Sequence, residues 1–246
     1  MADTDDPKVL GGLLALLVHD LRNPLSALHS NVDFLVSTLT NVDEDTRGAL
    51  EDAAVSCDSL VSIVDNAELL AFNLQGMLER PSEPLSVGAV VSEVVTRQHA
   101  LAESHGAQLA VDPSAMGSDV RIVAYREMYV RAFTNLLRNA IQHGSPGCVR
   151  VWIDHSEERV RLVVGDTGPA LSEDCRIAAF TAAGQLTSKG KAGGRYGRGL
   201  GLLAARLAAD SAGAVIQMVA PPPELSCAFA LSAPMLQRRR TEQPRP

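Results

Sequence analysis

The stretch of sequence that decides the fold is residues 8–39, KVLGGLLALLVHDLRNPLSALHSNVDFLVSTL. Its apolar residues recur at alternating steps of three and four, a spacing that places side chains along one face of an α-helix. The spacing therefore predicts one long helix with a buried stripe. The stripe consists of Leu10, Leu14, Leu17, Leu21, Leu25, Leu28, Val32, Leu35 and Leu39.

A second segment with the same rhythm, residues 46–78, predicts a second long helix. The short polar connector between the segments offers Asp43 and Thr46 as helix N-caps, so we expect an antiparallel hairpin. One hairpin is too thin to bury a stripe that runs for more than thirty residues. We therefore expect two hairpins from two chains to close a four-helix bundle, which makes the protein a homodimer.

A break in the pattern follows at Pro81 and Pro84, because neither a helix nor a central strand accepts two prolines so close together. Beyond it, helical patterns (86–104, 124–143 and 199–212) mix with strand-like stretches (149–153, 160–164 and 214–219), which indicates an α+β fold in which helices cover a sheet. The expected organisation is a hairpin domain (1–79), a linker (80–85), an α/β-sandwich domain (86–236) with a glycine-rich lid (181–197), and a disordered basic tail (237–246).

Composition excludes several classes of protein. With 22 Lys and Arg against 29 Asp and Glu, the net charge of −7 argues against a nucleic-acid partner. The longest apolar run, residues 9–18, is half of the roughly 20 residues that a membrane helix needs, and an acidic start argues against a secretory signal. We expect no membrane insertion. Scattered cysteines without metal-ligand spacing are expected to be reduced thiols of a cytoplasmic protein; they are Cys57, Cys148, Cys175 and Cys227.

The first chemical motif is His19-Asp20-Leu21-Arg22-Asn23-Pro24-Leu25. Helical spacing places His19 on a polar stripe opposite the leucines, so its ring is expected to face solvent. Pro24 inside the helix removes a hydrogen bond and is expected to kink the helix beside the histidine. An isolated histidine on a polar face is usually an ordinary surface residue. The adjacent acid, the polar residue one turn on and the proline weaken that interpretation.

The second motif is Asn135-Leu136-Leu137-Arg138-Asn139-Ala140-Ile141-Gln142-His143, in which Asn135, Asn139 and His143 share one helix face. A face of amides on a helix is unusual, because asparagine is a poor helix former. Amide oxygens are suitable ligands for a hard cation, and Mg²⁺ is the natural candidate.

Two glycine-containing segments complete the set. A strand-like run ends in Asp166-Thr167-Gly168-Pro169-Ala170, an acidic turn, and Gly197-Arg198-Gly199-Leu200-Gly201-Leu202 precedes a helix, where exposed backbone amides can bind phosphate. A dinucleotide-binding fingerprint does not fit the second segment, because no strand leads directly into it and no acidic residue follows about twenty positions later.

These four motifs, in this order, resemble those of the two-component sensor histidine kinases. The first matches the phospho-acceptor box H-[DE]-x-x-[TN]-P-L at every position. The others are similar to the N box, to the glycine box D-x-G-x-G with Ala170 in place of the second glycine, and to the glycine box G-x-G-L-G-L. The resemblance covers about residues 8–236 and implies a Bergerat-type ATP-binding domain after the dimerisation hairpin.

The resemblance also implies a role for each matching residue. His19 is the phosphorylated residue, Asp20 orients its ring and takes up its proton, and Asn23 supports dephosphorylation of the partner. Asn139 holds the Mg²⁺ that bridges the ATP phosphates, and Asp166 reads the adenine amino group. The remaining ATP-binding residues that it implies are Asn135, His143, Gly168, Lys189, Gly197, Gly199 and Gly201.

The implied function is an ATP-dependent protein-histidine kinase that transfers the phosphoryl group to an aspartate on the receiver domain of a response regulator, with phosphatase activity toward that regulator as a second role. No sensor domain is recognised in the chain, so a separate upstream sensor protein is expected. Gln142 and His143 stand where many relatives have Lys and Tyr, and with Ala170 they support the alternative of a non-catalytic phosphotransfer protein with a degenerate ATP-binding domain. An ATPase or serine kinase of the same nucleotide fold is disfavoured by the intact acceptor box.

Overall fold

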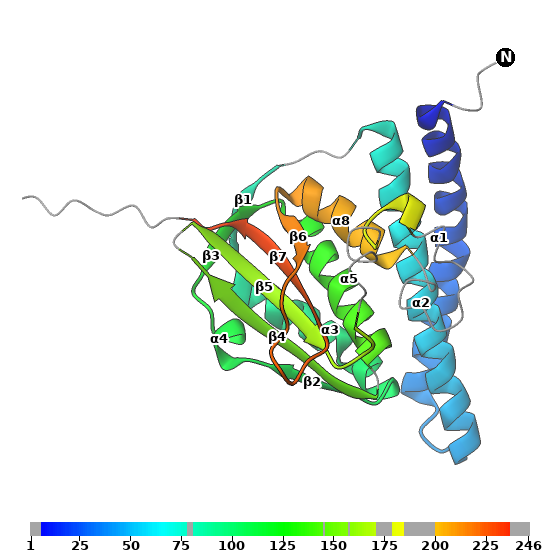
Figure 1. Cartoon of the computed structure of the whole chain (residues 1–246). Helices are drawn as coiled ribbons and strands as arrows, with labels where there is room; N and C mark the ends of the chain where they lie inside the picture. Colours follow the sequence, from blue (N-terminus) through cyan, green and yellow to red (C-terminus); the bar gives the residue numbers. More distant parts are fainter. Residues whose placement is uncertain are drawn as a thin grey trace, which may run out of the picture.

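The computed structural model describes residues 6–77, 81–144, 146–156, 158–170, 179–184 and 200–236. Two long helices, α1 (Pro7–Thr38) and α2 (Glu44–Gln75), form a hairpin that stands beside an α/β part (Figure 1). Helices α5 and α8 lie between the sheet and this hairpin. The predicted order of a helical hairpin followed by an α/β domain is confirmed.

The ends of the hairpin helices are set by capping residues. Asp6 accepts a hydrogen bond from the Lys8 backbone N–H at 2.9 Å, and Asp43 accepts one from the Thr46 backbone N–H at 2.8 Å. Of the two caps predicted for the second helix, Asp43 is therefore the cap and Thr46 is its donor. The helix ends three residues earlier than predicted, because Gly76 adopts a left-handed conformation with φ of 69°.

The two helices pack closely but along a narrow line. A Cβ added to Gly11 would lie 2.9 Å from the Cβ of Leu74, so only glycine permits this approach. Val18 and Val32 of α1 are buried against α2, whereas Leu17 is 56% exposed. The stripe predicted to be buried is thus mostly exposed in one chain, because two helices cover only a narrow seam of each other. Its exposed members are Leu10, Leu17, Leu21, Leu28, Leu35 and Leu39.

The α/β part is built on a five-stranded sheet with strand order β2-β4-β5-β7-β6. Its strands β2 and β4 are parallel and the other neighbours are antiparallel. The elements of this part, in chain order, are β1 (Glu83–Ser86), α3 (Val87–Ser104), β2 (Ala107–Val111), α4 (Pro113–Met116), β3 (Arg121–Ala124), α5 (Arg126–Gly144), β4 (Gly147–His155), β5 (Arg159–Asp166), α8 (Gly201–Ala212), β6 (Val215–Met218) and β7 (Cys227–Pro234).

The main core lies between the sheet and helices α3, α5 and α8. Phe133 and Leu137 of α5 and Phe229 of β7 are fully buried in it. The fully buried Leu69 of α2 joins the same core, so the hairpin is packed onto this part rather than merely tethered to it. The three predicted helices and three predicted strands are present, with ends that differ by a few residues.

The predicted linker contains part of a strand. The segment predicted as a linker, residues 80–85, contains the start of β1, which pairs antiparallel with β3. Pro84 is tolerated there because, among the described residues, β1 pairs with β3 only, so the missing N–H of Pro84 breaks no continuing ladder. None of the helices in the described ranges combines the length and the apolar character of a membrane-spanning segment.

Candidate functional site

His19 lies on the exposed face of α1, as predicted, with 75% of its side chain accessible. Its Nδ1 faces Asp20 Oδ1 at 3.5 Å. A hydrogen on Nδ1 pointing at this carboxylate leaves the lone pair on Nε2 directed at solvent. Asn23 is exposed one turn further on, and α1 continues without interruption through Pro24. The arrangement presents a nucleophilic nitrogen with a carboxylate behind it.

The second histidine of the same helix is differently placed. His29 Nδ1 lies 3.1 Å from Asp33 Oδ2, and its Nε2 lies 3.0 Å from Asp58 Oδ1 on α2. Both ring nitrogens of His29 are therefore occupied by carboxylates. Of these two histidines, His19 is the one with an available nitrogen.

Helix α5 carries the amide face that was predicted from the sequence. Asn135 and Asn139 are 6% and 8% exposed, and His143 is half-buried near the end of the helix. The Asn139 Nδ2 makes no hydrogen bond with any residue that the structure describes. A buried amide without a partner costs about 1–3 kcal/mol, so this side chain is suited to a ligand that completes its bonding.

Asp166 closes the site at the end of β5. Its side chain is completely buried and accepts a hydrogen bond from the Gly168 backbone N–H at 2.8 Å. The backbone of Asp166 is fixed by the Ser226 N–H, which donates to its carbonyl oxygen at 2.8 Å. A buried carboxylate of fixed orientation can recognise an amino group by a charge-assisted hydrogen bond.

The backbone of this acidic turn lies very close to the backbone at the end of α5. A Cβ on Gly168 would lie 2.7 Å from the His143 carbonyl carbon, and one on Gly144 would lie 2.8 Å from the Asp166 Cβ. The Thr167 hydroxyl accepts from the Cys148 N–H at 3.1 Å and lies 3.4 Å from the Gly144 carbonyl oxygen. The sequence interpretation missed Thr167 and Gly144, although the pair Gly144 and Gly147 is a visible signal of close packing.

The second glycine box is only partly described. Gly201 begins α8, and a Cβ added to it would lie 3.9 Å from Asn135 Oδ1, so the structure brings the start of this helix to the amide face. Lys189, Gly197 and Gly199, with most of the predicted lid, lie outside the described residues. Phe180, the residue before the predicted lid, packs edge to face against Phe229 with ring centroids 5.7 Å apart.

An unpredicted contact joins the amide face to the hairpin. Asn135 and Asn66 of α2 exchange two side-chain hydrogen bonds, each of 3.1 Å. A polar cavity of about 380 Å³ lies beside them, lined by Arg22 from α1 and Arg131 from α5 among others. Further along α5, burial lowers the pKa of Arg138, while Asp58 on α2 acts in the opposite direction. Three residues of α5, Arg131, Asn135 and Arg138, thus lie toward, or interact with, α2.

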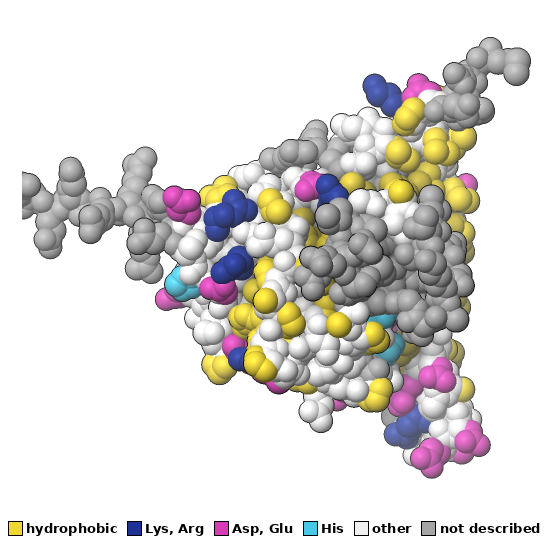
Figure 2. Space-filling view, viewed as in Figure 1, with side chains coloured by type: hydrophobic (Ala, Val, Ile, Leu, Met, Phe, Trp, Pro, Cys, Tyr) yellow, Lys and Arg dark blue, Asp and Glu magenta, His cyan; other side chains and the backbone are white. Residues whose placement is uncertain are grey.

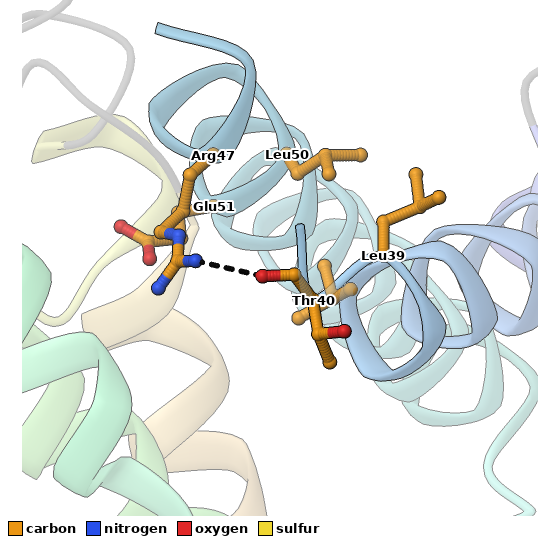
Figure 3. A pocket seen from close by; sticks show the side chains of 6 residues that line it. Leu39, Thr40, Arg47, Leu50 and Glu51 are labelled. Carbon is orange, nitrogen blue, oxygen red and sulfur yellow. Dashed lines mark hydrogen bonds between the residues drawn. The ribbon is translucent and has the colours of Figure 1, made fainter. Parts of the chain in front are cut away.

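A second hollow lies at the far end of the hairpin, away from these residues (Figure 3). It measures about 220 Å³ and is lined by Leu39 and Leu50 together with Arg47, which donates to the Thr40 carbonyl oxygen at 3.2 Å. The side chains around it combine the exposed Leu39 and the half-buried Leu50 with charged groups. Figure 2 shows the same contrast on a larger scale, with hydrophobic side chains along the hairpin and acidic ones at its tip.

Metal-binding side chains are sparse in the part of the chain that the structure describes. It holds no cluster of three or more His, Cys, Asp or Glu residues able to bind a metal ion. Asn139 can supply a single amide oxygen, which fits Mg²⁺, since this ion commonly takes its other ligands from phosphate and water.

Two family models match the chain, and together they span most of it. Residues 9–73 match the His Kinase A (phospho-acceptor) domain, and residues 124–237 match the ATPase domain of histidine kinases, DNA gyrase B and HSP90. The first match contains the exposed His19, and the second contains the amide face, Asp166 and Gly201.

Individual proteins agree with these models. The chain is 26% identical to the swarming motility regulation sensor protein RssA of Serratia marcescens, over 95% of this chain and 48% of that protein. It is 25% identical to the sensor histidine kinase YcbM of Bacillus subtilis, over 86% of this chain and 68% of that protein. The chain thus spans about half the length of the first relative.

Solved structures show the same fold. Full-length ShkA in complex with AMPPNP superposes with a TM-score of 0.61 over 92% of this chain and 46% of that one, at 23% identity. The Acinetobacter baumannii histidine kinase AdeS superposes with a TM-score of 0.53 over 89% of this chain and 98% of that one, at 17% identity.

Proposed function

The chain belongs to the two-component histidine kinases, and we propose that it uses ATP to phosphorylate His19 and then transfers the phosphoryl group to an aspartate of a response regulator. The observation that carries the proposal is the exposed His19 with Asp20 at its Nδ1, in one chain with a nucleotide fold that keeps Asp166 buried. The same fold buries Asn139, whose Nδ2 has no partner among the described residues. Loss of nucleotide chemistry would leave no reason to keep these two polar groups buried.

The acceptor chemistry follows from the tautomer that Asp20 favours. The Nε2 lone pair of His19 attacks the γ-phosphorus of ATP, an N–P bond forms, and the bond to the bridging oxygen breaks as ADP leaves. The positive charge that develops on the ring is stabilised by Asp20, which takes up the Nδ1 proton. In the second step the aspartate of the regulator displaces the imidazole, so the N–P bond is exchanged for an O–P bond.

Nucleotide binding is assigned to the residues around α5 and β5. Asp166 accepts a hydrogen bond from the adenine amino group, and Gly168 leaves space for that contact. Asn135, His143 and Gly201 support the phosphates, together with Lys189, Gly197 and Gly199. The Asn139 amide oxygen would hold Mg²⁺, which would supply positive charge to neutralise the phosphates. The Asn139 Nδ2, which has no partner among the described residues, supports a contact of this side chain with a phosphate oxygen beside the ion.

The assembly we propose is a homodimer formed through the exposed stripe of α1. Leu17 and Leu28 are each about half exposed on a helix that already packs against α2. A second hairpin would cover them and complete a four-helix bundle. We propose the division into residues 1–79, 80–85, 86–236 and 237–246, in which the second segment leads into the third through β1.

The proposal also covers the partner proteins of this kinase and its cellular compartment. The phosphoryl group passes to the receiver domain of a response regulator, and Asn23 positions a water for its later dephosphorylation. The reduced thiols of Cys57, Cys148 and Cys227 support a cytoplasmic location.

The proposal is tested by incubating the purified protein with Mg²⁺ and ATP labelled at the γ-phosphate. We expect a label that is labile in acid and stable in alkali, absent from His19→Ala and from Asn139→Ala, and transferable to a receiver domain. Bound nucleotide without label would favour the non-catalytic phosphotransfer protein, and label that survives His19→Ala would contradict the assigned acceptor.

A further inference from the structure

Asn135 and Asn66 form a reciprocal amide pair across the contact between α5 and α2. The Nδ2 of each side chain donates to the Oδ1 of the other at 3.1 Å, and the two residues are 6% and 8% exposed. They are 69 residues apart in the chain. A doubly hydrogen-bonded pair of buried amides specifies one relative position of the two helices.

This pair uses the whole donor capacity of Asn135. A side-chain amide has two N–H groups. One donates to Asn66, and the other donates to the Arg131 backbone carbonyl oxygen at 3.1 Å. Asn135 therefore has no N–H left for a phosphate oxygen while the pair is formed, although it lies next to Gly201 at the start of α8.

An ionic cluster beside the pair holds the same two helices together. Arg131 of α5 donates to the Asp65 carbonyl oxygen at 2.9 Å and lies 3.4 Å from Glu68 Oε2. Arg22 of α1 lies 3.1 Å from Asp65 and 2.9 Å from Glu68. Asp65 and Glu68 remain paired with Arg22 when Arg131 moves away. The contact between α5 and α2 can therefore open without leaving two unpaired carboxylates on the hairpin.

We propose that the Asn66–Asn135 pair is an autoinhibitory latch, which holds the ATP-binding part on the hairpin and withholds Asn135 from the nucleotide phosphates. The inference rests on the proposed function, because it assigns a regulatory state to the same site. Binding of the nucleotide phosphates and formation of the pair compete for one amide. By linkage, whatever opens the pair tightens nucleotide binding, and nucleotide in turn favours the open state.

The latch is tested by titrating AMPPNP with Mg²⁺ into the full chain by calorimetry. Asn66→Ala removes the pair and leaves every residue assigned to the nucleotide intact, so we expect binding about tenfold tighter than wild type, equivalent to ~1.4 kcal/mol. Asn66→Ser, whose side chain is too short to reach Asn135, should bind AMPPNP as tightly as Asn66→Ala. This second variant keeps the test valid if the alanine variant folds poorly. Asn73→Ala, an exposed asparagine of the same helix, is the matched control and should bind as wild type.

A second readout follows the docking itself. Small-angle scattering of the wild type should show a larger radius of gyration after AMPPNP is added, and Asn66→Ala should show this increase before addition. Unchanged affinity in both Asn66 variants would overturn the latch and leave the kinase proposal standing. Tighter binding without histidine phosphorylation would uphold the latch and reject the kinase proposal. Absence of AMPPNP binding in every variant would overturn both.

Discussion

Substitution of Gly168 by alanine tests how the acidic turn is built. The added Cβ would lie 2.7 Å from the His143 carbonyl carbon, nearer still to its oxygen, and 2.9 Å from Asp166 Oδ1. The carbon is about 0.7 Å inside the 3.4 Å at which ordinary contact begins. Since Gly168 does not have a positive φ, space alone requires glycine here.

The cost can be estimated from this overlap. Backbone cannot rotate away as a side chain does, so the turn or the end of α5 must shift, at about 1–3 kcal/mol. In a chain of this size such a loss lowers Tm by roughly 3–10 °C. The shift also disturbs the 2.8 Å hydrogen bond between the Gly168 N–H and Asp166. Because hydrogen bonds to charged groups contribute about 1.5–3 kcal/mol, we expect nucleotide affinity to fall at least about tenfold.

The assay combines thermal unfolding with calorimetric titration of AMPPNP. Gly117→Ala is the matched control, because its added Cβ would meet only the Pro113 carbonyl oxygen, at 3.4 Å. This control should keep the affinity of the wild type. A Gly168→Ala protein with wild-type Tm and wild-type affinity would refute the reasoning that the turn needs glycine for space.

Three further predictions concern other parts of the molecule. Asn139→Ala should abolish Mg²⁺-dependent nucleotide binding in calorimetry yet raise the Tm of the free protein by a few degrees, because it removes a buried N–H group with no partner in the described part of the chain and improves helix propensity. Asp43→Ala should lower Tm at pH 7 by removing a helix cap; the Thr46 N–H lowers the pKa of Asp43, so its contribution is present above the ordinary value of 3.8 and is lost as the pH falls through the lowered one, where the two Tm values should converge. Leu17→Glu combined with Leu28→Glu should convert a dimer into a species of 26.1 kDa by light scattering, and an unchanged mass would reject the proposed bundle.

Local patterns predicted the features that depend on neighbours in the chain. The spacing of leucines predicted α1, the acid at Asp43 predicted the start of α2, and the amide spacing predicted the face of α5. Asp166 was predicted from its place after a strand, and its complete burial is consistent with that interpretation. In each case the signal lies within about one helical turn or one strand.

Features that depend on distant segments were not predictable in this way. Pro84 was interpreted as part of a linker because its pairing partner, β3, lies almost forty residues away. Asn66 is indistinguishable in the sequence from a surface asparagine, and only the fold places it against Asn135. The exposure of the leucine stripe likewise depends on how much of α1 is covered by α2. The spacing of apolar residues along one helix carries no information about that coverage.

Phosphorylation of His19 is tested most directly by locating the phosphoryl group after reaction with Mg²⁺ and ATP, using fragment mass spectrometry at neutral pH and nitrogen-15 NMR. We expect it on Nε2 of His19 alone, because Nδ1 faces Asp20 and both ring nitrogens of His29 are held by carboxylates. A phosphoryl group on His29, or on a serine or threonine, would contradict the assignment of His19 as the acceptor.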